Sequence, residues 1–217
     1  MFEDLKEKIK DKKLIIFGEV HGTKEIPLII SRFFSEIAEE EYFDVCLEIP
    51  KEFQGEIDRF IESDDKNILE NISFFLYPGN QDGRGSREYI DLIKNLHSLN
   101  KKYRRSIRIF CVDSNANSQE EKERGIADKV LKILDDKKTF VILGDIHASK
   151  NLISFYGKKF LPAGAILFNK IRDKMFNIRI LPKKGKFFNF EIKDVLKDNS
   201  DDSFNENFDY IFEIGMV

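Results

Sequence analysis

Two short segments carry two of the three histidines of this chain in the same local pattern. Gly18-Glu19-Val20-His21 follows the apolar run 14–17, and Gly144-Asp145-Ile146-His147 follows the apolar run 140–143. An apolar run of this length that ends at glycine predicts a buried parallel strand followed by a tight turn. Open α/β sheets bind ligands at the carboxyl ends of such strands. The repeat therefore predicts that two acid–histidine pairs meet at one candidate active site.

Carboxylates also end the two strands that the sequence predicts between these segments. Glu48 ends a predicted strand at 43–48, and Asp113 follows one at 107–112. In a parallel sheet all of these strand ends lie along one edge. We therefore expect Glu19, Glu48 and Asp113 to lie near the two histidines, together with Asp145 as a substrate-binding candidate.

Two kinds of chemistry fit this set of residues. His21, His147 and Glu48 form a two-histidine, one-carboxylate set typical of a catalytic zinc or non-haem iron site, with Mn, Fe, Co or Zn as the candidate ion. Without a metal, one histidine can act as general base, oriented by a carboxylate, while the other stabilises developing charge. The residues alone leave both alternatives open.

Three arginines are candidates for holding an anionic group or an oxyanion. Arg84 and Arg87 lie in or next to the glycine-rich stretch 77–86, and the planar guanidinium suits recognition of anions and carbonyls. Arg124 lies two turns into a predicted helix, from which it can point back at the sheet edge. We expect Arg84 and Arg124 to take part in catalysis and Arg87, with Asp113, to bind substrate.

Composition limits the classes of protein to consider. The chain has 217 residues, which suits one domain over 1–217, and its net charge of −3 gives no field that favours nucleic acid or anionic lipid. No apolar run approaches the roughly 20 residues of a membrane span. Cys46 and Cys111 fall inside predicted strands and form no disulfide framework. We expect a cytoplasmic protein that acts on a small-molecule or peptide substrate.

The elements that must position these residues alternate between strand and helix. Strands at 14–17, 43–48, 107–112 and 140–143 are separated by helical patterns, one of them opened by the capping box Ser118-x-x-Glu121. This alternation predicts a largely parallel central sheet flanked by helices. Four further strands are predicted after Gly157, at 163–168, 176–181, 187–192 and 210–214. The segment 182–186 is predicted as a hairpin turn that joins the second of these strands to the third. The expected class is α/β with additional antiparallel C-terminal strands.

This arrangement resembles the erythromycin esterase/ChaN-like superfamily, which also takes in the Tiki and TraB/PrgY-type proteins. The resemblance rests on paired Gly-x-x-His motifs and extends from about residue 14 to residue 150. The matching segments are 15–23, Ile-Ile-Phe-Gly-Glu-Val-His-Gly-Thr; 46–50, Cys-Leu-Glu-Ile-Pro; 82–86, Asp-Gly-Arg-Gly-Ser; 110–113, Phe-Cys-Val-Asp; 124–127, Arg-Gly-Ile-Ala; and 141–148, Val-Ile-Leu-Gly-Asp-Ile-His-Ala.

The resemblance implies a fold with the histidine pair at the centre of the site, but the members of the superfamily differ in activity. Erythromycin esterases imply lactone hydrolysis without metal, with His21 as base, Glu48 as its partner and His147 opposite. Tiki proteins imply a metal-dependent peptidase, and ChaN-like proteins imply haem binding by an exported lipoprotein. Since the chain shows no export signal, the expectation is a small hydrolase of an ester, lactone or amide bond. The alternative is a haem- or metal-binding protein without turnover.

Overall fold

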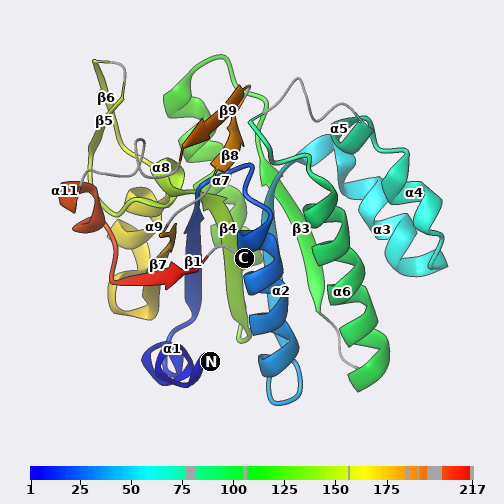
Figure 1. Cartoon of the computed structure of the whole chain (residues 1–217). Helices are drawn as coiled ribbons and strands as arrows, with labels where there is room; N and C mark the ends of the chain where they lie inside the picture. The colour runs from blue at the N-terminus through cyan, green and yellow to red at the C-terminus, as the bar shows by residue number, and fades with distance from the viewer. Residues whose placement is uncertain are drawn as a thin grey trace.

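The computed structural model describes residues 1–76, 82–104, 107–155, 157–183, 186–189, 191–194 and 202–215. Within these residues, six strands form a central sheet in the order β10-β7-β1-β4-β2-β3, and every neighbouring pair is parallel (Figure 1). The strands are β1 (Leu14–Glu19), β2 (Phe43–Pro50), β3 (Arg108–Asp113), β4 (Lys138–Gly144), β7 (Met175–Pro182) and β10 (Tyr210–Ile214). The expected α/β class with a largely parallel central sheet is confirmed.

Strand β1 lies inside the sheet and brings the two histidine motifs together. It pairs with β4 from Leu14 opposite Thr139 to Glu19 opposite Gly144, and on its other side it pairs with β7. All six residues of β1 are buried, as expected of a parallel strand whose two faces are both covered by helices. The register places the beginnings of the two motifs side by side at one edge of the sheet.

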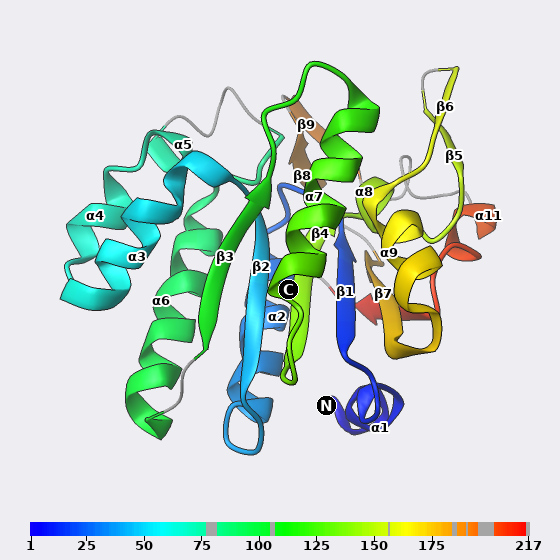
Figure 2. The same ribbon diagram turned by 180° about the vertical axis from the view of Figure 1, so that it is seen from behind.

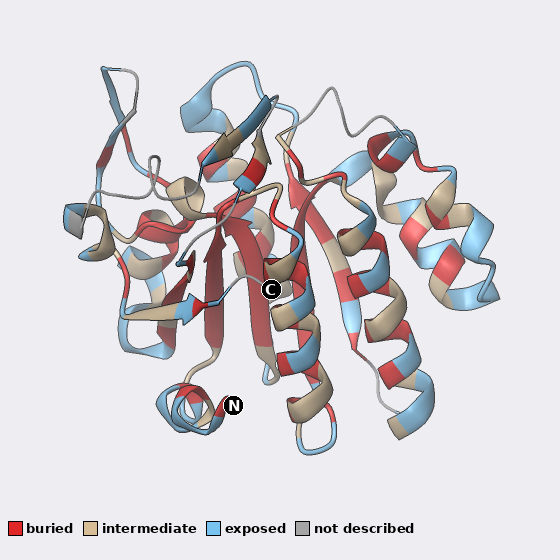
Figure 3. Cartoon of the chain, in the orientation of Figure 1, coloured by how far each residue is buried: buried red, intermediate tan, exposed pale blue. Residues whose placement is uncertain are grey.

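Helices cover both faces of the sheet. One face carries α1 (Glu3–Ile9), α2 (Glu25–Ile37) and α6 (Arg87–Tyr103), and the other carries α7 (Gln119–Ile133) and α9 (Ala163–Ile171) (Figures 1 and 2). The burial colours show the strands enclosed between these layers (Figure 3). None of the helices in the described part of the chain is long and apolar enough to cross a membrane.

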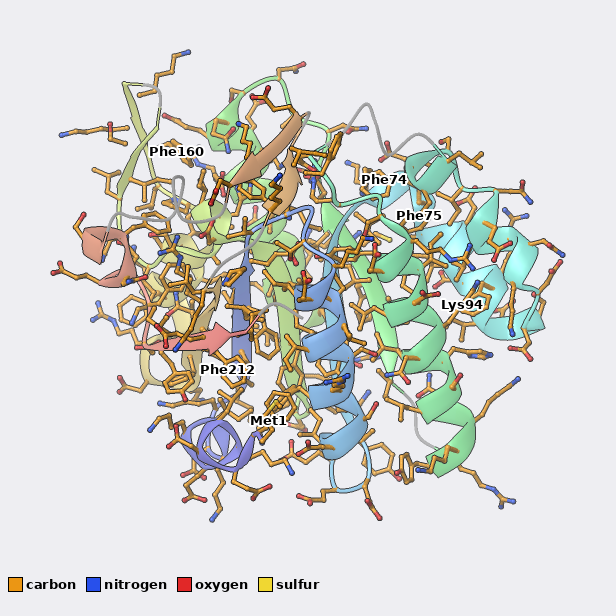
Figure 4. All side chains as sticks on the ribbon, viewed as in Figure 1. Met1, Phe74, Phe75, Lys94, Phe160 and Phe212 are labelled. Atoms are coloured by element: carbon orange, nitrogen blue, oxygen red, sulfur yellow. The ribbon has the colours of Figure 1, made fainter. Side chains whose placement is uncertain are left out.

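Shorter elements complete the chain. Their bounds are η1 (Lys51–Phe53), α3 (Gln54–Ser63), α4 (Lys66–Glu70), α5 (Ser73–Leu76), α8 (Asp145–Ala148), η3 (Arg172–Lys174) and α11 (Asp202–Asn205). On α5, the rings of Phe74 and Phe75 lie 5.4 Å apart, and Lys94 of α6 donates to Glu70 of α4 at 2.8 Å (Figure 4). The Lys94–Glu70 bond joins α4 to α6, whereas the two rings pack within α5.

The core on the α2 side is built around aromatic rings. Phe140 of β4 has its ring centroid 5.3 Å from those of Phe34 and Phe43, 5.7 Å from Phe33 and 6.0 Å from Phe17. Three of these four contacts are edge-to-face, a geometry that the quadrupole of the ring favours. The cluster packs β1, β2 and β4 against α2. Glu19 belongs to β1 and Glu48 to β2, so the same cluster fixes the strands that carry these two site residues.

The last third of the chain differs from the expectation in two places. The predicted strand at 163–168 lies in helix α9, since an apolar run of this length does not by itself distinguish a strand from a buried helix. The predicted hairpin between 176–181 and 187–192 is also wrong, because β7 joins the parallel sheet beside β1.

Antiparallel strands are nevertheless present in this part of the chain, as two small separate sheets. β5 (Ile153–Phe155) pairs with β6 (Lys158–Phe160), and β8 (Lys186–Asn189) pairs with β9 (Glu191–Asp194). The β8–β9 hairpin lies above the ends of β1 and β4 (Figure 1). The antiparallel strands therefore lie outside the central sheet, whereas the predicted strands at 176–181 and 210–214 extend it as the parallel strands β7 and β10.

Candidate active site

Two imidazoles face one buried carboxylate from two sides. Glu48, near the end of β2, is 3% exposed. Its Oε2 lies 3.6 Å from His21 Nε2, and its Oε1 lies 3.5 Å from His147 Nε2. His147 belongs to α8, the single turn directly after β4. A Cβ atom on Gly144 would lie 2.6 Å from His21 Nε2, so glycine at this position makes room for the ring.

Each imidazole is held from behind by a second buried carboxylate. His21 Nδ1 lies 2.7 Å from Glu19 Oε1, which also accepts a hydrogen bond from the hydroxyl of Tyr89. His147 Nδ1 lies 2.7 Å from Glu123 Oε1. Because a carboxylate only accepts, each Nδ1 carries the proton of this bond, and each Nε2 is directed at Glu48.

The support behind His147 extends through α7 to α9. Glu123 is completely buried, and its Oε1 accepts from the side-chain amide of Gln119. Its Oε2 accepts from the backbone N–H of Ala163, the first residue of α9, at 2.8 Å. A carboxylate at a helix N-terminus is favourably placed toward the helix dipole. The orientation of His147 therefore depends on how two helices pack against the sheet.

Two cations lie on the Oε1 side of Glu48. Arg84 Nη1 donates to Glu48 Oε1 and to Asp113 Oδ2, both at 2.8 Å. Lys122 Nζ lies 3.2 Å from the same Glu48 oxygen and 3.3 Å from Asp113 Oδ1. On the other side, Glu48 Oε2 accepts from the N–H of Gly144 at 2.8 Å. The buried charge of Glu48 is thus compensated by direct partners, as burial of a carboxylate requires.

These surroundings shift two pKa values in opposite directions. Burial alone would raise the pKa of Glu48, but the charges of His147, Arg84, His21 and Lys122 outweigh it and hold the pKa well below its usual range. Burial alone would lower the pKa of His21, but the hydrogen bond and charge of Glu19, with the charges of Glu48 and Asp82, raise it to about 9. Glu48 is therefore ionised and His21 protonated at neutral pH.

A divalent metal does not fit the residues that converge here. Glu48 Oε1 is taken by Arg84 and Lys122 and its Oε2 by the Gly144 N–H. A metal ion bound to Glu48 would lie next to two positive side chains. Among the residues that the structure describes, no group of three or more His, Cys, Asp or Glu side chains is arranged to hold a metal ion.

Three residues expected at the site lie elsewhere. The side chain of Arg124 is 72% exposed and approaches Glu120 one helical turn away at 3.9 Å. Arg87 is 64% exposed and lies near Glu70 and Asp91. Asp145 turns toward Arg179 of β7, with Oδ2 3.0 Å from Nε. The position of a residue in the sequence does not fix the direction of its side chain, because the side chains of successive helix residues point about 100° apart.

Lys122, Glu123 and Tyr89 are contacts that the sequence reasoning missed. Glu123 precedes the buried Ile126, Ala127 and Val130 of α7 by three, four and seven positions. That spacing puts it on the apolar face of the helix. An acidic residue on an apolar face is a signal that the sequence does contain. Lys122 carries no comparable signal, because polar residues are common in an exposed first turn.

No protein-family model and no curated protein matches the sequence. By structure, the chain is similar to a mutant of the erythromycin esterase EreC in its open conformation, with a TM-score of 0.65, 12% identity and coverage of 85% of this chain and 74% of that one. It is similar to a succinoglycan biosynthesis protein, with a TM-score of 0.64, 16% identity and coverage of 89% and 73%. A structure of ChaN of Campylobacter jejuni with cofacial haem aligns with a TM-score of 0.48, 14% identity and coverage of 82% and 85%. The expected resemblance is thus confirmed for the fold by the erythromycin esterase structure, and identities this low establish the fold alone.

Proposed function

We propose that this protein hydrolyses an ester, lactone or amide bond without a metal, through His21, Glu48 and His147. One observation carries the proposal: two imidazoles, each fixed at Nδ1 by its own buried carboxylate, direct Nε2 at the same point. This is the arrangement in which an imidazole transfers protons at a defined atom. The fold shared with an erythromycin esterase supports the same reaction class.

The two imidazoles take different roles in this proposal. His21 is protonated at neutral pH, since its pKa is about 9, so it serves as the proton donor. His147, oriented by Glu123, serves as the general base in its neutral form, in which Nε2 carries no proton and the ring adds no positive charge beside Glu48. Water attacks the carbonyl carbon as its proton moves to His147 Nε2; the bond to the leaving group then breaks, and the leaving oxygen or nitrogen takes the proton of His21 Nε2. Solvent exchange restores both rings.

In this proposal Arg84 and Lys122 stabilise the negative charge that develops on the carbonyl oxygen. Both are cationic, partly exposed and bound to the same oxygen of Glu48. Donors held in place before the reaction stabilise an oxyanion more than mobile water does. Glu48 holds these cations and both imidazoles together, and is a positioning residue in this scheme.

The test is a panel of esters, lactones and amides assayed with the wild type, His21→Ala and His147→Ala. Loss of either histidine should lower turnover by on the order of 100-fold or more, the range of general acid–base catalysis. Arg124→Ala, on the exposed face of α7, is the control and should keep full activity. A chelator should leave wild-type turnover unchanged.

Three outcomes would contradict the proposal. They are full activity in both histidine variants, loss of activity on chelation, and absence of hydrolysis together with a Soret band on haem titration that the histidine variants lose. The last outcome would support the haem-binding alternative, and the second would support a metal-assisted reaction.

A further inference from the structure

Three separate segments of backbone cross in direct contact beside the site. The N–H of Phe188 in β8 donates to the carbonyl of Gly22 at 3.1 Å. A Cβ on Gly22 would lie 1.8 Å from Phe188 O, and one on Gly83 would lie 2.3 Å from Gly22 Cα. Both glycines have positive φ, +78° and +96°. Neither position has room for a side chain, so glycine is required here by close approach as well as by conformation.

Each glycine is joined directly to a residue of the site. Gly22 follows His21, and Gly83 precedes Arg84. The hairpin that presses on them is anchored on its other face, because Phe187 is buried in the core. Its neighbour Phe188 pairs with Ile192 of β9. Because successive side chains of a strand point to opposite faces, the side chain of Phe188 lies on the other face of the hairpin from Phe187. The hairpin is therefore a fixed part of the fold at the point where it touches both loops.

We propose that the β8–β9 hairpin positions His21 and Arg84, with Phe188, Gly22 and Gly83 as the positioning residues. Contact between the hairpin backbone and the two glycines sets how far the Gly22 and Gly83 loops stand from Glu48. The 3.6 Å approach of His21 Nε2 and the 2.8 Å bond of Arg84 to Glu48 both depend on that setting. The structural part stands alone, and only its catalytic consequence rests on the proposed function.

The test compares Gly22→Ala with Gly157→Ala. Gly157 has a similar φ of +74°, but a Cβ there meets no atom within 4 Å, so it controls for backbone strain without contact. In Gly22→Ala the amide of Phe188 should exchange with solvent on the order of tenfold faster, since its hydrogen bond is lost. The ring-nitrogen NMR signals of His21 should shift as well. Gly157→Ala should change neither signal.

A second variant keeps the test decisive if Gly22→Ala does not fold. Phe188→Pro removes the N–H that donates to Gly22 and leaves the glycine residue itself unchanged, although the proline ring carbon that replaces the hydrogen faces the Gly22 carbonyl. It should shift the His21 ring signals, and on any substrate found in the panel it should lower kcat more than it raises KM. Unchanged His21 signals in a folded Phe188→Pro or Gly22→Ala variant would overturn the proposal. Because the NMR result needs no substrate, it remains valid if the chain proves not to be a hydrolase.

Discussion

At the scale of single residues, the site depends on one buried carboxylate and its partners. The strand-end argument from the sequence places His21, Glu48 and His147 at one point, and the glycine-rich stretch offers Arg84 as an anion-binding candidate; the structure brings these four together. The strand-end argument does not predict Lys122, because the direction of a side chain in the first turn of α7 depends on how that helix lies on the sheet. The positions of His21, Glu48 and His147 could be predicted from the ends of strands, although the same argument also placed Asp145 at the site, where it turns toward Arg179 instead. Residues supplied by packing between elements could not be predicted in this way.

Glu48→Gln should destabilise the fold. The amide keeps the shape of the side chain but removes the charge that balances Arg84 and Lys122, and breaking a buried ion pair costs roughly 3–5 kcal/mol. Denaturant unfolding followed by circular dichroism measures this cost. Glu120→Gln, on the exposed side of α7, is the matched control and should change the free energy of unfolding by less than about 0.5 kcal/mol. Equal effects of the two variants would show that Glu48 is not the structural centre described above.

Stability should fall with rising pH on account of His21. Its pKa is raised from 6.5 to about 9 in the folded protein, so its protonation stabilises the fold fully below pH 6.5. That stabilisation, roughly 3 kcal/mol at most, is lost as the pH rises to about 9. Unfolding free energies measured from pH 6 to 9.5 should show the decline in the wild type and a smaller one in His21→Ala. Parallel curves for the two proteins would refute the assignment.

At the scale of elements, a helix or strand was predicted correctly where its local sequence pattern fits only one kind of secondary structure. The four strands between 14 and 144 follow from apolar runs with clear ends. Ser118 caps α7 as predicted, with the N–H of Glu121 donating to Ser118 Oγ at 3.2 Å, but the carboxylate of Glu121 accepts from the N–H of Asn117 at 3.1 Å and so does not complete the capping box. The run at 163–168 gave no such signal. Its helical state comes from tertiary contacts, including the bond of the Ala163 N–H to Glu123.

Ser118→Ala should show that the start of α7 supports the site. Loss of the cap costs about 1 kcal/mol and loosens the first turn, which carries Lys122 and directly precedes Glu123. We expect a small decrease in the unfolding midpoint and faster amide exchange confined to that turn. Ser118→Asp, which retains a capping oxygen, should restore both. If the aspartate variant behaves like alanine, the hydroxyl of Ser118 is not acting as the cap.

At the scale of the whole molecule, the sequence predicts the class of sheet but not its order. No local pattern tells that β1 pairs with β4 and β7 instead of with β2, its neighbour along the chain. That order follows from how the helices cover both faces and from the aromatic cluster around Phe140. It also decides the site, because the β1–β4 pairing is what brings His21 to His147.

Phe140→Ala should lower global stability without changing the fold. Removing a completely buried ring in contact with four others costs roughly 3–5 kcal/mol. The denaturation midpoint should fall while the dependence of free energy on denaturant stays the same. Leu28→Ala, an exposed aliphatic position on α2, is the control and should cost less than about 0.5 kcal/mol. A comparable loss in both would show that the cluster does not dominate the core.

The sheet order also bears on how the chain is made in the cell. β1 is among the first segments to be synthesised, yet both of its partners come from much later, β4 at Lys138 and β7 at Met175. At 5–20 residues per second, the ribosome takes roughly 6–24 s to reach β4 after completing β1. During that interval a strand that begins with four apolar residues has no partner to pair with, and it is a natural substrate for chaperones that bind exposed hydrophobic segments of nascent chains.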